Sequence, residues 1–360
     1  DWIHGGPWIT PASLAAPWRA PVTEALGEFD VVVASGPGPI FAQFSGRPWA
    51  FYATGGDLTV KPFPITFWRW YDTWPHRAAE LVAGAWMRRA APRADEVWMQ
   101  PFAPMARAAD RLHVAQDRRS RQQVPIVVDT DAYSPTAIVT EPTARWVDDA
   151  LDGAGFTVFH PSRLVLDRTE ALERTGQWKG NGALLEAVAL VRRDRPDLDL
   201  TLVMPDTPLS RDVAAARERC AALGIDDVVR WLRPPDGRLF DRDHMVELYR
   251  RSDVVADEFG VGWFGYVSLE GAAMERPVLC HIDEAAMAQM YPSHPFVSVL
   301  DPADVAAAII DLHDDPEARA QRGMEGRRWV EAYHRADVVA GAIGDLVGAL
   351  VDRSRAPRGH

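Results

Sequence analysis

Residues 253–277 read DVVADEFGVGWFGYVSLEGAAMERP, and this stretch decides the fold that we predict for the chain. It begins with the apolar pair Val254–Val255 and continues into a glycine-rich turn. We predict a helix from about Ser268, with the carboxylate of Glu270 in its first turn. Such a turn presents free backbone N–H groups and the positive end of a helix dipole to an anion. The stretch is therefore either an anion site or a structural turn of an α/β sheet.

The end of this stretch carries a pattern known from one enzyme family. The run GYVSLEGAAM at 265–274 is followed by Arg276-Pro277-Val278. It resembles the nucleotide-sugar signature of the retaining GT-B glycosyltransferases, in particular the bacterial family four or group 1 enzymes. The resemblance implies that Glu270 holds the ribose hydroxyls of the donor. It also implies that backbone N–H groups cradle the donor diphosphate, and the donor-binding candidates are Gly265, Tyr266, Val267 and Ser268.

One position departs from the family pattern. The family carries a second glutamate eight residues before the first, where it contacts the donor sugar, and this chain has Gly262 there. Asp257 and Glu258 lie on the other side of the glycines and are candidates to replace it. We include Glu258 among the donor-binding residues.

Two basic residues form the second signal. Arg163 and Lys179 each stand where a strand should give way to a helix. An arginine offers a planar fork and a lysine a mobile point charge, so the pair suits a diphosphate. The resemblance implies that Arg163, Lys179 and Glu270 form the catalytic set, with residues 167–176 as an insertion. Considered alone, each of these basic residues would be interpreted as an ordinary solvent-exposed residue of the surface.

Other candidate residues follow strands elsewhere in the chain. Arg233 comes after an apolar run, where the family places its base-binding loop, although a structural role is equally well supported. Ligands gather beyond the carboxyl ends of strands in open α/β sheets. The turns after Val31–Ala34 and Pro48–Ala53 therefore supply acceptor-side candidates, namely Gly36, Gly56 and Asp57, with a purely structural turn as the alternative.

The segment 64–74 is the most aromatic part of the chain. We favour an interdomain core for it, since aromatic side chains bury large apolar areas. The alternative is an amphipathic patch that meets a lipid-linked or aromatic acceptor, with Arg69, His76 and Arg77 on its phosphate side.

Asp129 and Asp131 could be read as a metal-binding pair, because hard cations prefer carboxylates. We favour another interpretation, in which Pro125–Asp131 is a strand that leads from the first domain to the second. The resemblance implies that protein cations and dipoles assist the departing diphosphate. We therefore expect no metal and no cofactor apart from the donor substrate.

Composition limits the remaining possibilities. The chain has 360 residues and a net charge of −12, which argues against a nucleic-acid binder. Two cysteines without metal or redox spacing indicate a reducing compartment, and we expect a cytoplasmic protein with peripheral membrane contact at most. The start at Asp1 without a methionine suggests a fragment or a processed product.

Strands alternate with helices over most of the chain, which indicates βαβ units and parallel sheets. We predict the α/β class with a GT-B architecture, in which two Rossmann-like domains face an interdomain cleft and the N-terminal one is short. The expected domains are an acceptor-side domain over 1–140 and a donor domain over 141–334. Residues 335–360 are expected to form a helix that crosses back to the first domain, followed by a polar tail.

The function implied by the resemblance is retaining transfer of a sugar from a nucleoside diphosphate sugar to an acceptor hydroxyl. The acceptor would be a small molecule, a glycan or a lipid-linked compound. Two alternatives stay open: a GT-B-like binding or partner subunit without transfer activity, and a GT-B-fold epimerase that acts on a UDP-sugar. A donor-hydrolysis assay distinguishes the enzyme from the inactive subunit.

Overall fold

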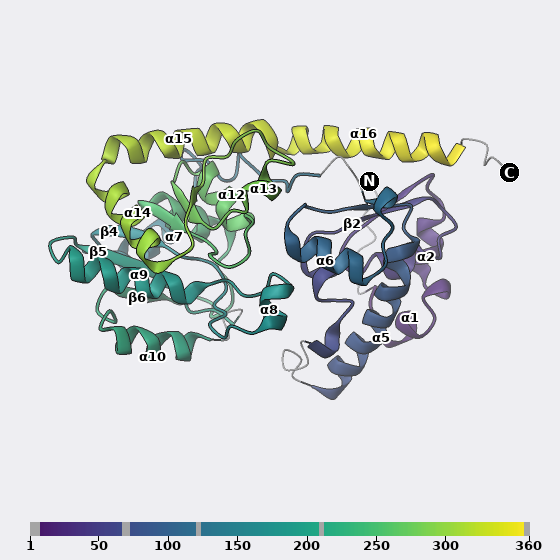
Figure 1. Cartoon of the computed structure of the whole chain (residues 1–360), viewed down its shortest axis with the longest axis horizontal. Coiled ribbons are helices and arrows are strands. Elements are labelled where there is room, and N and C mark those ends of the chain that lie inside the picture. The colour runs from purple at the N-terminus through teal and green to yellow at the C-terminus, as the bar shows by residue number, and fades with distance from the viewer. Residues whose placement is uncertain (1–7, 67–72, 120–123, 209–211, 356–360) are drawn as a thin grey trace. The chain divides into compact units, whose positions relative to one another are not determined.

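The structure is a computed structural model that describes residues 8–66, 73–119, 124–208 and 212–355. It divides into two compact units (Figure 1). The first comprises residues 1–125 together with 340–360, and the second comprises residues 126–339. The aromatic segment 64–74 falls largely on residues 67–72, which lie outside the described residues, so the two interpretations of that segment stay predictions.

The first unit is built on a three-stranded parallel sheet in the order β1-β2-β3. Its strands are β1 (Val32–Ala34), β2 (Trp49–Tyr52) and β3 (Glu96–Trp98). In the register Val33 lies opposite Ala50, and Phe51 lies opposite Val97. All of β3 and nearly all of β2 are buried. Near-complete burial of this kind is typical of the apolar strands of parallel sheets.

Helices connect these strands. Those of the first unit are α1 (Pro11–Ala15), α2 (Pro21–Leu26), α3 (Pro39–Ala42), α4 (Gly56–Thr59), α5 (Trp74–Ala90) and α6 (Ala103–Arg111). Thr73 precedes α5, and its side chain accepts a hydrogen bond from the N–H of His76, which fixes the start of the helix. The buried side of α5 carries small residues and Met87. A Cβ on Gly84 would lie 2.7 Å from Pro64, so the close approach there requires glycine.

The second unit is built on a six-stranded sheet in the order β6-β5-β4-β7-β8-β9, and all its strand pairs are parallel. The strands are β4 (Phe156–Phe159), β5 (Leu200–Pro205), β6 (Val229–Leu232), β7 (Val254–Ala256), β8 (Val278–Cys280) and β9 (Val297–Ser298). The chain extends the sheet in one direction from β4 and in the other from β7. The topological switch point of this doubly wound sheet therefore lies between β4 and β7, where such sheets bind ligands.

Helices cover the six-stranded sheet on both sides (Figure 1). They are α7 (Glu141–Ala150), α8 (Glu170–Arg174), α9 (Asn181–Asp194), α10 (Val213–Leu223), α11 (Arg242–Arg250), α12 (Tyr266–Ala273), α13 (Glu284–Met287), α14 (Pro302–Asp314) and α15 (Pro316–Tyr333). The helix α14 packs on α9, and α12 packs on α15. The latter pair is close, because a Cβ on Gly326 would lie 3.3 Å from the Cβ of Ala272.

Most predicted strands are confirmed to within two residues at each end, but one is wrong. The segment 125–131 is not a strand of either sheet, and its only ladder contact among the described residues is a single bridge from Val128 to Arg335. Several helices were also not predicted, among them α7 and α8. Pro142 lies in the first turn of α7, where the missing N–H of a proline costs nothing. The presumed insertion at 167–176 contains α8.

The units divide after Pro125, whereas the sequence placed the domain boundary at 140. The reason is that the segment 126–139 is held by the second unit. The imidazole of His334 lies 2.6 Å from the carbonyl oxygen of Ile126, and the guanidinium of Arg250 donates to the carbonyl of Pro135 at 3.2 Å. These bonds replace the sheet ladder that the apolar run suggested.

The last helix, α16 (Ala336–Arg355), starts in the second unit, and its residues from Ala340 onward belong to the first. Leu346 and Leu350 are buried, and the guanidinium of Arg353 forms an ion pair with Glu96 of β3. Among the described residues, no helix combines the length and the apolar character that crossing a bilayer requires.

Candidate functional site

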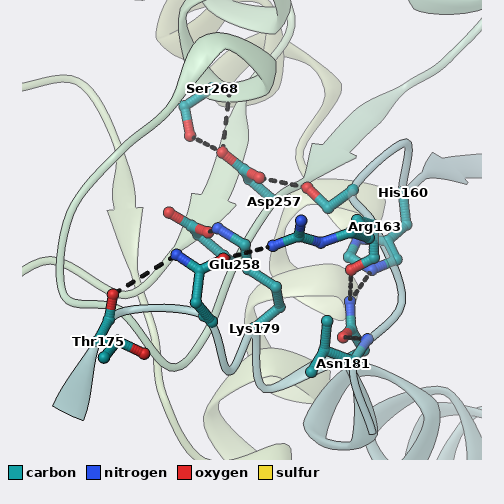
Figure 2. A network of polar contacts seen from close by, with 11 residues as sticks. His160, Arg163, Thr175, Lys179, Asn181, Asp257, Glu258 and Ser268 are labelled. Atoms are coloured by element: carbon teal, nitrogen blue, oxygen red, sulfur yellow. Dashed lines mark hydrogen bonds and ion pairs between the residues drawn. The ribbon is translucent and has the colours of Figure 1, made fainter. Parts of the chain in front are cut away.

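Asp257 is the central carboxylate at the carboxyl end of β7. It is 3% exposed, and its Oδ2 accepts hydrogen bonds from the hydroxyl of Ser268 at 2.5 Å and from the N–H of Ser268 at 3.2 Å. Its Oδ1 accepts a hydrogen bond from the hydroxyl of Ser162, which follows β4. Asp257 thereby joins both strands of the switch point to the first turn of α12 (Figure 2). A carboxylate at this position also satisfies one of the unpaired N–H groups of the helix.

Glu258 is the second carboxylate, and it forms an ion pair with Lys179. Glu258 is 5% exposed, and burial raises the pKa of its carboxyl to about 7 from 4.5. The positive charge of Lys179 opposes this shift, and the negative charge of Asp257 adds to it. Glu258 is therefore a buried acid that is paired with one cation, Lys179, and a second acid, Asp257, lies beside it.

Glycine makes the close approach of these two segments possible. Gly180 has a φ of +69°, and a Cβ there would lie 2.9 Å from the backbone carbonyl carbon of Phe259. The N–H of Phe259 donates to the carbonyl of Lys179 at 2.7 Å. Backbone contact therefore fixes the position of Lys179 against the turn that carries Glu258.

His160 is a structural residue at the end of β4. Its Nδ1 lies 2.8 Å from the carbonyl oxygen of Ala256, and its Nε2 lies 2.8 Å from the side-chain nitrogen of Asn181. A carbonyl accepts and an amide nitrogen donates, so these partners fix a neutral imidazole with its proton on Nδ1. Burial lowers the pKa of His160, in agreement with that state. Asn181 also accepts the N–H of Val165 at 2.8 Å, which holds the turn after β4 against α9.

Arg163 extends from this turn towards the same group of residues. Its guanidinium donates to the side-chain oxygen of Gln177 at 2.8 Å, and its carbonyl accepts from Asn181 at 3.4 Å. The charge of Arg163 acts on Glu258 and lowers the pKa of that carboxyl, although burial outweighs it. The structure thus brings Arg163, Lys179 and Glu258 together, as Figure 2 shows.

Glu270 lies on α12 one turn further along than predicted. The helix starts at Tyr266 rather than at Ser268, so Glu270 is its fifth residue and stands in its second turn. The hydroxyl of Tyr249 donates to its Oε2 at 2.9 Å, and Tyr133 makes a second hydrogen bond to it. Burial raises the pKa of Glu270 to about 7, while both tyrosines act in the opposite direction. The two phenols therefore hold this carboxyl in a fixed orientation.

Four further donor-binding candidates lie at the start of α12. The N–H of Ser268 is already taken by Asp257, and its hydroxyl is as well. Gly265, Tyr266 and Val267 precede it, and a helix cannot satisfy the N–H groups of its first turn internally. These three residues are thus the part of the predicted cradle that can meet an anion.

The structure does not bring Arg233 into this group. It follows β6 at the edge of the sheet, two strands away from β4. Its guanidinium, 70% exposed, donates to Asp206 at 2.8 Å. Arg217 makes a longer contact with the same carboxylate, at 3.4 Å. The base-binding role predicted for Arg233 gains no support from a contact with the residues of the switch point.

The acceptor-side candidates belong to the first unit and form one turn structure. The carboxylate of Asp57 accepts the N–H groups of Thr54, Gly55 and Leu58, each at 3.0 Å. It also accepts the N–H of Gly36 at 3.0 Å and so links the turns after β1 and β2. Gly56 opens α4 beside it. The carboxylate oxygens of Asp57 therefore accept mainly from backbone N–H groups. This agrees with the interpretation of these residues as a purely structural turn.

Asp129 and Asp131 lie in a turn rather than on a strand. Asp129 accepts the N–H groups of Asp131 at 3.2 Å and Ala132 at 2.9 Å, which is the geometry of a side-chain-stabilised turn. In the described part of the chain, no three histidine, cysteine or carboxylate side chains come together in a way that could hold a metal ion.

No protein-family model matches the chain. It is 28% identical over 253 residues to a D-inositol 3-phosphate glycosyltransferase of Corynebacterium kroppenstedtii, which covers 61% of this chain and 53% of that protein. It is 31% identical over 184 residues to the protein of the same name from Streptomyces avermitilis, covering 49% and 38%. The chain spans about half or less of the length of the curated relatives that it matches.

Solved structures match over nearly the whole chain. The Anabaena protein HepE, crystallised with UDP and glucose, matches with a TM-score of 0.64 at 17% identity, over 95% of this chain and 84% of that one. Sucrose-phosphate synthase from Thermosynechococcus elongatus matches with a TM-score of 0.61 at 16% identity, over 95% and 79%. The chain has the GT-B fold of the glycosyltransferases. The predicted fold class and the resemblance are confirmed.

Several residues of this GT-B site could not be named from the sequence. Ser162, Asn181 and Gln177 fix the groups that the signature does show, and Tyr133 and Tyr249 hold Glu270. Only Tyr133 lies next to a segment that the sequence singled out, since it follows Pro125–Asp131 by two residues. The others lie far from their partners in the sequence, and single serines, asparagines and glutamines form no pattern.

Proposed function

We propose that the chain is a glycosyltransferase that transfers a sugar from a nucleoside diphosphate sugar to an acceptor hydroxyl. The observation that carries the proposal is the ion pair between Lys179 and Glu258, which lies beside Arg163 at the switch point of the second sheet. The relatives named as glycosyltransferases support it. So does the fold shared with a protein that was solved with UDP and glucose.

The two cations act on the diphosphate. When the bond to the sugar breaks, negative charge develops on the leaving diphosphate, and fixed positive groups stabilise it most at that moment. Lys179 supplies a mobile ammonium group, and Arg163 supplies a planar fork. The N–H groups of Gly265, Tyr266 and Val267 add the positive end of α12. We assign these groups to the donor diphosphate.

Glu258 replaces the family glutamate that is missing at Gly262. It is buried and adjacent to Lys179, and the turn that follows it contains Gly260 and Gly262. Its carboxylate can accept two sugar hydroxyls, whereas Gly262 offers no side chain. We therefore place Glu258 against the donor sugar. Donor binding then moves Lys179 from this carboxylate to the diphosphate.

Glu270 is assigned to the ribose of the donor. A carboxylate can accept both vicinal hydroxyls at once, and the phenols of Tyr133 and Tyr249 hold it ready for that geometry. The base would then extend towards the carboxyl ends of β5 and β6, where Arg233 and Asp206 stand. UDP-glucose is the first donor to test, since the HepE structures contain UDP, glucose or UDP-glucose.

We further propose that transfer proceeds with retention and without a metal, because Asp129 stabilises a turn and the cations of the protein suffice for the leaving group. Transfer should therefore survive excess chelator and the Asp129→Asn substitution. Activity that disappears with chelator and returns with Mn²⁺ or Mg²⁺ would contradict this part of the proposal.

Calorimetric titration with UDP and GDP tests the donor site directly. Lys179→Ala and Arg163→Ala each remove a charge-assisted contact of about 1.5–3 kcal/mol, so the Kd for the preferred nucleotide should rise at least about tenfold. Arg195→Ala is the matched control, because it removes an arginine that pairs with Asp197 and Asp314 and precedes β5, at the opposite end of that strand from the proposed site. Equal nucleotide affinity of the wild type and both site variants would contradict the assignment of Lys179 and Arg163 to the diphosphate.

The transfer reaction itself separates the enzyme from its alternatives. Donor consumption is followed across a panel of UDP- and GDP-sugars, with and without acceptors that include inositol phosphate, which the names of the relatives suggest. Release of nucleoside diphosphate supports the transferase. A protein that binds nucleotide yet neither transfers nor hydrolyses any donor would be the partner subunit. Interconversion of UDP-sugars without release of UDP would indicate the epimerase.

A further inference from the structure

The first unit contains a cavity that the proposed reaction does not use. It has a volume of about 570 Å³ and is lined by segments near 43–49, 93–95, 117–118 and 350–353, all of which belong to this unit. Trp49 and Asp95 place it at the amino ends of β2 and β3. Gly36 and Asp57 follow the carboxyl ends of β1 and β2, so the cavity lies at the opposite edge of the same sheet.

Four arginines line this cavity, namely Arg47, Arg93, Arg118 and Arg353. Only two carboxylates, Asp95 and Asp117, line it with them. The lining therefore carries a formal excess of two positive charges, in a chain whose net charge is −12. An anionic protein that gathers cations around one concavity creates a local attraction for anions. We call this cavity the arginine pocket.

Three of these guanidinium groups are anchored by neutral partners. Arg47 donates to the carbonyl of Gly27 at 2.7 Å, Arg93 to that of Arg89 at 2.9 Å, and Arg118 to that of Pro92 at 2.9 Å. Over the described ranges of the first unit, none of the three forms an ion pair with a carboxylate. A carbonyl orients a guanidinium without neutralising it, and each group keeps further N–H donors for a ligand. Arg353 differs, since it pairs with Glu96.

One of the two carboxylates is also engaged. The Oδ2 of Asp95 accepts the N–H of Trp49 at 2.9 Å, which connects the starts of two neighbouring strands. This hydrogen bond orients Asp95 and leaves its negative charge in place, so the formal excess of two positive charges in the lining stands. Most exposed arginines on a protein surface lie beside a carboxylate or point into solvent. Here three converge on one cavity with their orientations fixed by the backbone.

We propose that the arginine pocket binds a compact anion that carries a phosphate group. The planar fork of arginine matches the oxygens of a phosphate in a bidentate way. The volume is in the range of small-molecule sites, and the mostly charged lining suits a hydrophilic ligand. Such a group occurs on a phosphorylated metabolite and on the headgroup of an anionic lipid, and both would present the same oxygens to the arginines.

The test compares a pocket variant with a variant of equal charge. Arg47→Gln combined with Arg118→Gln removes two of the unpaired guanidinium groups. Arg19→Gln combined with Arg89→Gln removes two exposed arginines of the same unit that do not line the pocket. Thermal unfolding establishes that both proteins are folded. Inorganic phosphate and glycerol 3-phosphate are then titrated calorimetrically, and vesicles of phosphatidylcholine with and without phosphatidic acid are used for cosedimentation.

We expect the wild type to bind glycerol 3-phosphate with a Kd below about 1 mM, and the pocket variant to bind at least about tenfold more weakly. The control variant should bind like the wild type. Binding of the free phosphates alone identifies a metabolite site, whereas cosedimentation that the pocket variant loses identifies a headgroup site. Failure to bind either probe overturns the proposal, as does a loss that both variants share.

Binding at the proposed donor site must be distinguished from binding in the arginine pocket. The Lys179→Ala variant retains all four arginines and should therefore bind glycerol 3-phosphate as the wild type does. Phosphate binding that Lys179→Ala abolishes and the pocket variant leaves intact would assign the anion to the donor site and overturn the pocket. Conversely, the proposed function can fail while the pocket variant still loses phosphate, because the two sites share no residue.

Discussion

The carboxyl edges of the two sheets both carry glycine turns with an acid, but they use the acids differently. In the first unit, Asp57 accepts four backbone N–H groups, three from its own turn and one from Gly36, and a longer hydrogen bond from the hydroxyl of the neighbouring Thr54. In the second, Asp257 and Glu258 are almost fully buried and bind side chains from three other segments. An acid bound by backbone groups stabilises a turn. An acid bound by a mobile cation can exchange that cation with a ligand.

The largest effect should come from breaking this exchange. Glu258→Gln keeps the size of the side chain but loses the charge that holds Lys179. We expect transfer to fall by at least about 100-fold, because the donor sugar loses an accepting carboxylate in the transition state. Affinity for free UDP should stay the same or increase, since the released ammonium group can contact the diphosphate.

Steady-state transfer and calorimetric UDP binding measure the two quantities in parallel. A matched control is Glu96→Gln, which removes a buried carboxylate of the first unit that also pairs with a basic residue. Transfer that Glu258→Gln leaves unchanged would mean that the turn backbone holds the sugar. UDP binding that weakens would show that the pair does not compete with the diphosphate.

Because Asp57 binds a turn and not a mobile cation, we expect Asp57→Ala to change stability and to leave nucleotide binding unchanged. This substitution leaves several N–H groups without their acceptor, so the free energy of unfolding should fall by about 1–3 kcal/mol. UDP affinity should not change, because Asp57 belongs to the first unit and to a turn. Denaturant unfolding and calorimetry provide both values. A variant that is as stable as the wild type but impaired with the acceptor would restore the acceptor-side role.

The last effect concerns the pH dependence of stability at Glu270. Burial raises its folded pKa to about 7 from 4.5, so the folded state binds this proton more tightly than the unfolded chain. The free energy of unfolding therefore decreases as the pH rises through this interval. Glu270→Gln lacks the titration, so its stability relative to the wild type should increase between pH 5 and pH 8 by roughly 1–3 kcal/mol.

Urea unfolding of both proteins at several pH values gives this difference directly, since shared contributions from the buried histidines cancel. A constant difference across the interval would mean that the folded pKa of Glu270 is close to its ordinary value. The same variant should bind UDP more weakly, as the ribose assignment requires.

The second sheet was predictable because its strands are buried on both faces. Every residue of β5 is buried, and an apolar run of that kind between helices has few other interpretations. The segment 125–131 has a similar composition, yet its backbone pairs at only one described position, with Arg335. Composition cannot distinguish a strand with two neighbours from an extended segment that is held by isolated contacts.

The site was predictable to a different degree. Glu270, Arg163 and Lys179 occur at a characteristic spacing in the sequence. This spacing is recognisable because the lengths of the strands and helices between these residues fix it. The partners of these residues depend on how distant segments meet. Tyr249 reaches Glu270 across 21 residues, and Asp257 reaches Ser162 across 95. The pairing of Lys179 with Glu258 depends on the backbone approach at Gly180, which no spacing reveals.

The path of α16 has a consequence for how the protein is made. Leu346, Leu350 and Arg353 complete the first unit, although the rest of its described structure is encoded before residue 126. During synthesis, domains generally fold as units once their residues have emerged. The second unit is contiguous and can therefore form while the first still lacks its final helix. Of the two units, the one that is translated first is thus the one that finishes folding last.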